Sequence, residues 1–330
     1  MCENPGMNRV GGPLIHTAGK PAAEQMRIIR RYHRGQLSRL APGVYIDAAE
    51  HRRLDRSNAH VAWITAQAVS TPGAVVVGRS AALLWGLPLD VTTTDLPVEL
   101  AGPHRRRGQV GRWMVLRTVS GEGGITVLRT RYGQVRVTER VRTCLDLARW
   151  HTLEDATVAL DHCLHHGLCG RGELEDGVGK LVGSTNVSAA RQAVRLATAA
   201  SESPRESSLK VRMWRQGLPA PVQQAELYNE AGDFLGRVDF FFPDTGLAVE
   251  YDGQGKFEGE FGLDPLTAIR DSMLRQDELL NAGVVLVRID RDSYRDGSGM
   301  AAVLRRHHQL LRSGYRLPRS QWTSAGPAWR

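Results

Sequence analysis

The chain has 330 residues, enough for two domains, and 42% of them are hydrophobic and 24% charged. This composition is that of a folded protein and excludes a disordered or collagen-like chain, and no apolar stretch approaches the ~20 residues that span a membrane. The net charge of +8 is uneven, because residues 1–200 carry 26 basic and 17 acidic side chains and residues 201–330 carry 17 and 18.

The basic front of the chain indicates a nucleic-acid partner, because phosphate backbones attract clustered cationic side chains. Four of the 43 basic residues are lysine and the others are arginine, a bias that genome composition alone can also produce. The N-terminus shows no basic and apolar leader, and the four cysteines contain no Cys-x-x-Cys spacing. We therefore expect a cytoplasmic protein with reduced cysteines and no membrane partner.

The N-terminal segment is predicted to contain a basic helix. Residues 1–20 are polar and glycine-rich, so we expect a frayed or disordered terminus. Residues 22–33 have helical spacing, and residues 37–46 read as two strands around Pro42-Gly43, which is the order of recognition helix and wing in a winged helix. A solvated amphipathic helix without a partner explains the same spacing. The candidate nucleic-acid-binding side chains here are Arg27, Arg30, Arg31, Arg34 and Arg39.

The middle of the chain alternates between helical and strand patterns. The expected elements are a helix at 57–70, a strand at 74–77, a helix at 79–87, a β-rich segment at 96–138, and helices at 143–150, 153–166, 173–178 and 188–200. One loop of the β-rich segment carries three consecutive arginines. It is either a phosphate clamp or an exposed loop without function, and its residues are Arg105, Arg106 and Arg107.

The C-terminal part places acidic residues on predicted strands. Ser203-Pro204-Arg205-Glu206 is a helix capping box, which explains Glu206 structurally, although helical spacing also turns Glu206 inward. Strands are expected at 222–228, 237–242 and 247–252. A hairpin of the last two brings Asp239 beside Glu250, and Asp252 shares the face of Glu250.

Carboxylates on adjoining strands repel one another unless a cation lies between them. Mg²⁺ takes one or two carboxylates together with waters and phosphate oxygens, and such an ion activates water for phosphodiester hydrolysis. Asp239 and Glu250 are therefore candidate ligands of Mg²⁺ or Mn²⁺. A helix at 265–281 and an apolar strand at 284–289 complete a predicted α/β/α layer.

Residues 200–300 resemble the PD-(D/E)xK restriction-endonuclease-like fold, in the branch similar to very-short-patch-repair (Vsr-like) endonucleases. The resemblance rests on Ser203-Pro204-Arg205-Glu206-Ser207, Arg237-Val238-Asp239-Phe240 and Val249-Glu250-Tyr251-Asp252-Gly253. It implies an α/β/α domain with a mixed sheet and a metal-dependent deoxyribonuclease site. In that site Asp239 and Glu250 hold the metal. The resemblance also makes Glu206 a metal-binding or water-orienting residue. In the nuclease hypothesis Asp252 assists as well, and Lys256 stabilises charge as a further catalytic residue.

The N-terminal part is similar to AbiEi-like antitoxins of type IV toxin–antitoxin systems. The similarity rests on Leu40-Ala41-Pro42-Gly43-Val44-Tyr45, on Gly78-Arg79-Ser80 and the eight residues that follow, and on the segment 142–148. It implies an α+β part made of a partial winged helix, a small β-rich segment and helices. It also implies a DNA partner, and it leaves open whether a toxin or operon partner exists and what the oligomeric state is.

Two departures from the endonuclease pattern separate two hypotheses. Asp252 stands where the motif has a lysine, with Lys256 the nearest lysine, and Met273 stands where relatives often carry another. Arg270 or Arg275 can replace a lysine as a phosphate clamp but is a poor acid. The chain is then either a metal-dependent endonuclease or a catalytically inactive, antitoxin-like transcriptional regulator that retains the nuclease fold. A third hypothesis is a two-domain scaffold without a functional site, in which the acids are surface groups and Glu206 only caps its helix. This hypothesis is disfavoured, because it leaves several acids unpaired on a half-buried sheet.

The expected plan of the chain has five parts. They are a frayed terminus at 1–20, a winged-helix-like segment at 21–95, a β-rich segment followed by helices at 96–200, an endonuclease-like domain at 201–300, and a helix with a tail at 301–330.

Overall fold

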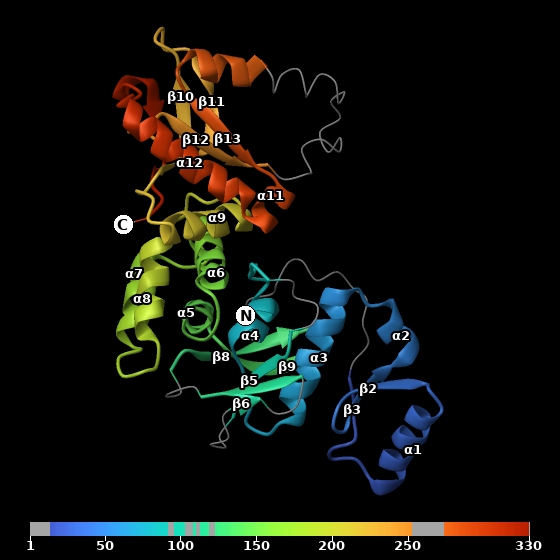
Figure 1. Cartoon of the computed structure of the whole chain (residues 1–330). Helices are drawn as coiled ribbons and strands as arrows, with labels where there is room; N and C mark the ends of the chain where they lie inside the picture. Colours follow the sequence, from blue (N-terminus) through green and yellow to red (C-terminus); the bar gives the residue numbers. More distant parts are fainter. Residues whose placement is uncertain are drawn as a thin grey trace. The chain divides into compact units, whose positions relative to one another are not determined.

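The computed structural model describes residues 14–91, 96–102, 108–109, 113–118, 123–252 and 274–329 (Figure 1). The chain divides into two compact units. Unit 1 comprises Met1–Ala159 and Leu168–Ala193, and unit 2 comprises Leu160–Gly167 and Val194–Arg330. The described residues form three sheets and many helices, which confirms the expected α+β N-terminal part and α/β C-terminal part. None of the described helices is long and apolar enough to cross a membrane.

Unit 1 begins with a helix and a three-stranded sheet. The elements are β1 (Ile15–His16), α1 (Ala22–His33), β2 (Leu37–Ala41) and β3 (Val44–Asp47), with strand order β1-β3-β2. The helix and the β2–β3 hairpin follow the predicted pattern, with Gly43 at a positive φ of 72° in the turn. Ile15, within the segment expected to be frayed, instead pairs with Tyr45. It does so because its side chain packs against Ile28, Leu37 and Tyr45.

The rest of unit 1 is a six-stranded mixed sheet with helices. The helices before and between its strands are α2 (Ala48–Arg53), α3 (Arg56–Ser70) and α4 (Gly78–Trp85). The strands are β4 (Val75–Val76), β5 (Val98–Ala101), β6 (Gly108–Gln109), β7 (Met114–Arg117), β8 (Ile125–Thr130) and β9 (Gly133–Thr138), in the order β6-β7-β5-β4-β9-β8. The helices after the sheet are α5 (Arg140–Trp150), α6 (Leu153–His165), α7 (Arg171–Gly179) and α8 (Val187–Leu196). The last turns of α6 belong to unit 2.

A buried carboxylate explains the Gly78-Arg79-Ser80 motif. Glu99 is 2% exposed and accepts hydrogen bonds from the Arg79 backbone N–H at 2.7 Å and from Arg117 at 2.6 Å, with His151 Nε2 at 2.8 Å. Burial acts to raise the pKa of Glu99, but the His151 and Arg117 contacts outweigh it and lower that pKa. A Cβ at position 78 would lie 2.2 Å from Glu99 Oε2, and φ there is 56°, so only glycine fits.

Unit 2 is a mixed sheet covered on both faces. Its elements are α9 (Pro204–Arg215), β10 (Val222–Tyr228), β11 (Phe234–Phe242), β12 (Leu247–Tyr251), a helix at 274–281, β13 (Val285–Ile289), α11 (Arg291–Asp296), α12 (Ser298–Ser313), a 3₁₀ turn (Arg319–Gln321), β14 (Trp322–Thr323) and β15 (Gly326–Pro327). The strand order is β13-β12-β11-β10-β14, and β15 also pairs with β10. Strands β12 and β13 are parallel and the other pairs are antiparallel, so the sheet is mixed as expected.

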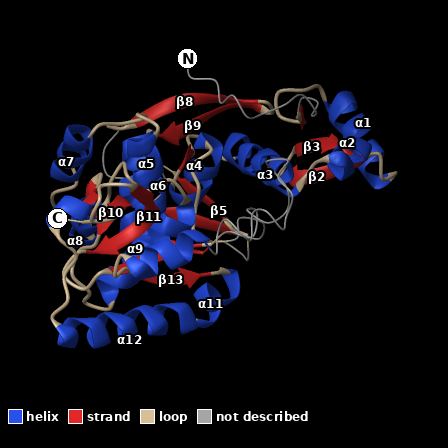
Figure 2. Cartoon of the chain, turned by 90° about the horizontal axis from the view of Figure 1, so that it is seen from above, coloured by secondary structure: helices blue, strands red, loops and turns tan. Residues whose placement is uncertain are grey.

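Two hydrophobic clusters identify the layers of unit 2. On one face, Leu209 of α9 and Val303 of α12 pack with Phe240 and Val249 of the sheet. On the other face, Leu279 of the helix at 274–281 packs with neighbouring sheet residues. Figure 2 shows α9, α11 and α12 gathered beside the strands of this unit. The arrangement is an α/β/α layer, in which the expected C-terminal tail adds β14 and β15 to the sheet.

Candidate active site in the C-terminal unit

The two predicted metal ligands lie on neighbouring strands. The β11–β12 pairing ends at Phe240 and Val249, with Asp239 directly before Phe240 and Glu250 directly after Val249. The Tyr251 backbone N–H donates to Asp239 Oδ2 at 2.8 Å, so the Asp239 side chain reaches the end of β12. Asp239 and Glu250 therefore lie at the same end of the paired part of these two strands, in the hairpin that the sequence pattern predicts.

Two arginines are paired with Glu250. Arg275, on the helix at 274–281, donates to Glu250 Oε1 at 2.7 Å and also to the Arg237 carbonyl oxygen at 2.6 Å. Arg288, the register partner of Glu250 on β13, approaches Oε2 at 3.4 Å. The Glu250 side chain is only 14% exposed, so these charges interact with less solvent screening than a surface pair. Within the part of the chain that the structure describes, the cations beside Glu250 are thus two arginines.

Glu206 has a complete set of local partners. Its Oε2 accepts from the Glu202 backbone N–H and from Gln224 Nε2, each at 3.0 Å, while Ser203 Oγ accepts from the Glu206 N–H at 3.2 Å. Burial raises the pKa of the Glu206 carboxyl above its usual value, and these hydrogen bonds oppose the rise. The capping function expected of this segment is confirmed for Ser203. A catalytic role of Glu206 stays a prediction.

The strand opposite Asp239 is irregular. Gln223 pairs with Phe240 and Ala225 pairs with Val238, and between them Gln224 has a φ of 48°. The left-handed region costs a non-glycine residue roughly 1–2 kcal/mol. The alternation of side chains between the two faces of β11 is also interrupted here. Val238 and Phe241 are three residues apart but pack on the same face of the sheet. Strained backbone of this kind concentrates at functional sites.

Of the remaining predicted site residues, the structure describes Asp252 but not Lys256. Asp252 is half-buried at the end of β12, and its backbone N–H donates to the Ile289 carbonyl oxygen at 2.9 Å. Lys256 lies outside the described residues, as do Arg270 and Met273. The described part of the chain contains no group of three or more His, Cys, Asp or Glu side chains able to hold a metal ion. The pair Asp239 and Glu250 nevertheless fits Mg²⁺, which accepts two carboxylates when waters and phosphate oxygens complete its shell.

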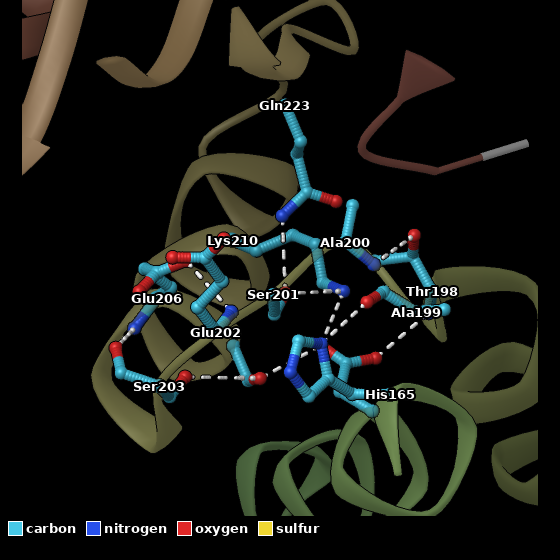
Figure 3. Close-up of polar contacts among 12 residues, drawn as sticks. His165, Thr198, Ala199, Ala200, Ser201, Glu202, Ser203, Glu206, Lys210 and Gln223 are labelled. Carbon is cyan, nitrogen blue, oxygen red and sulfur yellow. Dashed lines mark hydrogen bonds and ion pairs between the residues drawn. The ribbon is translucent and has the colours of Figure 1, made fainter. Parts of the chain in front are cut away.

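A second polar cluster lies beside Glu206 on α9 (Figure 3). Lys210 is 0% exposed and donates to Asp161 Oδ2 at 2.6 Å, and Ser207 Oγ donates to the same oxygen at 2.7 Å. The Thr198 N–H donates to Asp161 Oδ1 at 2.8 Å. No sequence pattern predicted this network, although Lys210 lies four residues after Glu206 on the inward side of α9, an unusual place for a lysine.

Most of the described arginines that were predicted to bind nucleic acid are exposed to solvent. Arg27, Arg30 and Arg34 follow helical spacing on α1 and are exposed, and Arg39 is exposed on β2. Arg31 is half-buried and lies 3.9 Å from Asp47. Arg105, Arg106 and Arg107 lie outside the described residues. Helix α1 packs on β2, and we refer to the exposed arginines Arg27, Arg30, Arg34 and Arg39 together as the basic surface of unit 1.

Comparison with known proteins gives distant relatives. No family model matches the chain. Uncharacterized protein MT2308 and uncharacterized protein Rv2248, from two strains of Mycobacterium tuberculosis, are each 32% identical over 166 residues. The match covers 50% of this chain and spans 59% of the length of those relatives. The crystal structure of the Rv2827c protein from M. tuberculosis is similar over 61% of this chain and 76% of that one, with 14% identity and a TM-score of 0.35.

Proposed function

We propose that the chain is a DNA-binding protein whose C-terminal unit is a Mg²⁺- or Mn²⁺-dependent endonuclease. The observation that carries the proposal is that Asp239 and Glu250 lie at the same end of the paired part of β11 and β12, with Arg275 and Arg288 beside Glu250. Two carboxylates and adjacent cations are suited to a divalent ion and a phosphate group bound together. The resemblance of residues 200–300 to PD-(D/E)xK endonucleases supports the same assignment.

A divalent ion bound at such a site supplies activated water and stabilises the departing phosphate oxygen. The residues of the chain contribute orientation and charge. The Tyr251 N–H donates to Asp239 Oδ2 and so helps to fix the orientation of this carboxylate. Arg275 and Arg288 supply the positive charge that the motif lysine provides elsewhere, and their guanidinium groups can bind a phosphate in two-pronged fashion. Because arginine does not give up a proton near pH 7, the leaving oxygen takes its proton from water or from a protonated carboxyl group.

The basic surface of unit 1 is assigned to the DNA backbone. Arg27, Arg30 and Arg34 lie on the outer side of α1, next to the β2–β3 hairpin that carries Arg39. Contacts of this type are made to phosphates and are independent of sequence, so their affinity falls steeply with salt.

A catalytically inactive, antitoxin-like regulator is the second candidate. It is favoured by the ion pairs of Glu250, because both carboxylate oxygens already have arginine partners. In this alternative the arginines replace the metal, the acids hold the sheet edge together, and the protein binds DNA without cutting it.

Calorimetric titration with Mn²⁺ and incubation with supercoiled plasmid separate the two candidates. The wild type is compared with Asp239→Asn and with the matched control Asp244→Asn, which changes an exposed acid in the same unit. Binding and nicking that are lost only in Asp239→Asn support the endonuclease. Metal binding without nicking supports the regulator, and no binding at millimolar Mn²⁺ removes the metal site.

A further inference from the structure

Unit 1 contains a hollow of its own. It has a volume of about 520 Å³, which is within the ~300–1,000 Å³ of small-molecule sites. Strand β2, helix α2, helix α3 and the residue before β7 surround it. Its described lining residues are Arg39, Leu40, His51, Arg56, His60, Trp63 and Trp113, together with Ala59.

One wall of the hollow is a row of aromatic rings. The rings of His60 and Trp63 on α3 are arranged edge to face with their centroids 5.5 Å apart. The rings of Trp63 and Trp113 have the same arrangement, with centroids 5.8 Å apart. Trp63 also packs against the main hydrophobic cluster of the unit, so its ring is supported from behind. Trp113 is 45% exposed, and its carbonyl oxygen accepts from the Val98 N–H at 2.8 Å. The backbone of Trp113 is therefore held by the sheet, while nearly half of the residue's surface remains accessible to solvent.

The other walls of the hollow are cationic. Arg39 and Arg56 are exposed, His51 is half-buried, and the described residues that line the hollow include no acidic side chain. Arg56 follows the helix cap Asp55, whose carboxylate is bonded to Asn58. Flat aromatic surface next to two guanidinium groups matches a ligand with a planar ring and a phosphate.

We propose that this hollow binds one nucleotide of single-stranded DNA, with the base stacked on Trp113 and its phosphate held by Arg39 and Arg56. Arg39 is also part of the basic surface of unit 1, so a strand that follows that surface is led to the hollow. Duplex DNA keeps its bases stacked inside and can offer this site only phosphates. The inference rests on the DNA-binding part of the proposed function and is independent of metal-dependent cutting.

The test measures anisotropy of a fluorescein-labelled dT dodecamer, in EDTA so that no cutting occurs. Trp113→Ala is expected to weaken binding by about tenfold or more, the range of a lost base–aromatic stack. Trp113→Phe keeps a stacking surface and is expected to restore most of the affinity. Arg56→Ala is expected to weaken binding more than the control Arg53→Ala, which removes an exposed arginine outside the hollow. Thermal unfolding checks that each variant folds.

Several results would overturn the assignment. Equal affinity of wild type, Trp113→Ala and Arg56→Ala for the dT dodecamer would remove the nucleotide site. Binding of thymidine monophosphate as tight as that of the dodecamer would assign the hollow to a free nucleotide and not to a strand. Failure of the endonuclease proposal gives a different result. The wild type then does not nick plasmid, but it still binds the dodecamer, and Trp113→Ala still weakens that binding.

Discussion

Removing one member of the Asp161–Lys210 pair is expected to destabilise unit 2 more than removing both. Lys210 is 0% exposed and Asp161 is 1% exposed, and their charges are 2.6 Å apart. Asp161→Asn leaves a buried ammonium group without its counter-charge, although the asparagine oxygen can still accept from the Thr198 N–H. Lys210→Met leaves the carboxylate with only Ser207 and Thr198 as hydrogen-bond donors.

The expected loss in free energy of unfolding follows from the burial of both side chains. Breaking a buried ion pair by removing one partner costs about 3–5 kcal/mol, whereas replacing both partners by neutral groups is often close to neutral. We expect Asp161→Asn to reach this range. Lys210→Met is expected to fall in the same range, because a lone buried carboxylate and a lone buried ammonium need pKa shifts of similar size to become neutral near pH 7. The double variant Asp161→Asn/Lys210→Met is then more stable than Asp161→Asn alone.

The assay is urea unfolding followed by circular dichroism, with the free energy of unfolding obtained by linear extrapolation. The matched control is the exposed pair of Arg316 and Asp244, 3.7 Å apart, whose removal by Asp244→Asn should cost less than about 1 kcal/mol. If the effects of Asp161→Asn and Lys210→Met simply add in the double variant, the two residues are not coupled and the reasoning from burial is refuted.

Three further perturbations test other parts of the structure. Gly78→Ala should lower the free energy of unfolding of unit 1 by at least about 1–3 kcal/mol, measured by thermal unfolding, because φ is 56° and the new Cβ meets Glu99. Burial raises the pKa of Glu206 above its ordinary value of 4.5 in the folded protein, so the free energy of unfolding falls as pH rises from 4.5 through the folded pKa. Glu206→Gln should therefore have a higher free energy of unfolding than wild type at pH 7. This advantage should disappear near pH 4, where the carboxyl is protonated in both states. Arg275→Ala should bind Mn²⁺ more tightly by calorimetry, because Glu250 loses a competing cation, while plasmid nicking falls; weaker Mn²⁺ binding would contradict the proposed role of Arg275.

Elements with a periodic pattern were predictable from the sequence. Helix Ala22–His33 and strand Val222–Tyr228 have the predicted bounds, because apolar residues recur along them with helical or alternating spacing. Helix Ala48–Arg53 and strands Trp322–Thr323 and Gly326–Pro327 were not predicted. Elements of two to six residues carry too few positions for a period and exist because a cap or a neighbouring strand stabilises them.

The acids of the candidate site were predictable, but their partners were not. The hairpin of Arg237–Phe242 with Leu247–Asp252 is local in sequence, so the neighbourhood of Asp239 and Glu250 follows from strand alternation. The partners of Glu250 are 25 and 38 residues away, and Asp161 is 49 residues from Lys210. Only the packing of helices on the sheet brings such charges together, and no spacing rule encodes it.

In the proposed site, charge balance is expected to link metal binding to DNA binding. Among the described residues of that site, Asp239, Glu250 and Asp252 contribute three negative charges and Arg275 and Arg288 two positive ones, so we expect these residues alone to attract a divalent ion weakly. One bound phosphodiester adds a negative charge, and a divalent ion then restores neutrality. Because such coupling is reciprocal, Ca²⁺, which supports binding, should tighten duplex binding to wild type but not to Asp239→Asn in anisotropy titrations at constant ionic strength. Equal Ca²⁺ effects on both proteins would show that the ion acts on DNA or on general screening and that these carboxylates do not form a metal site.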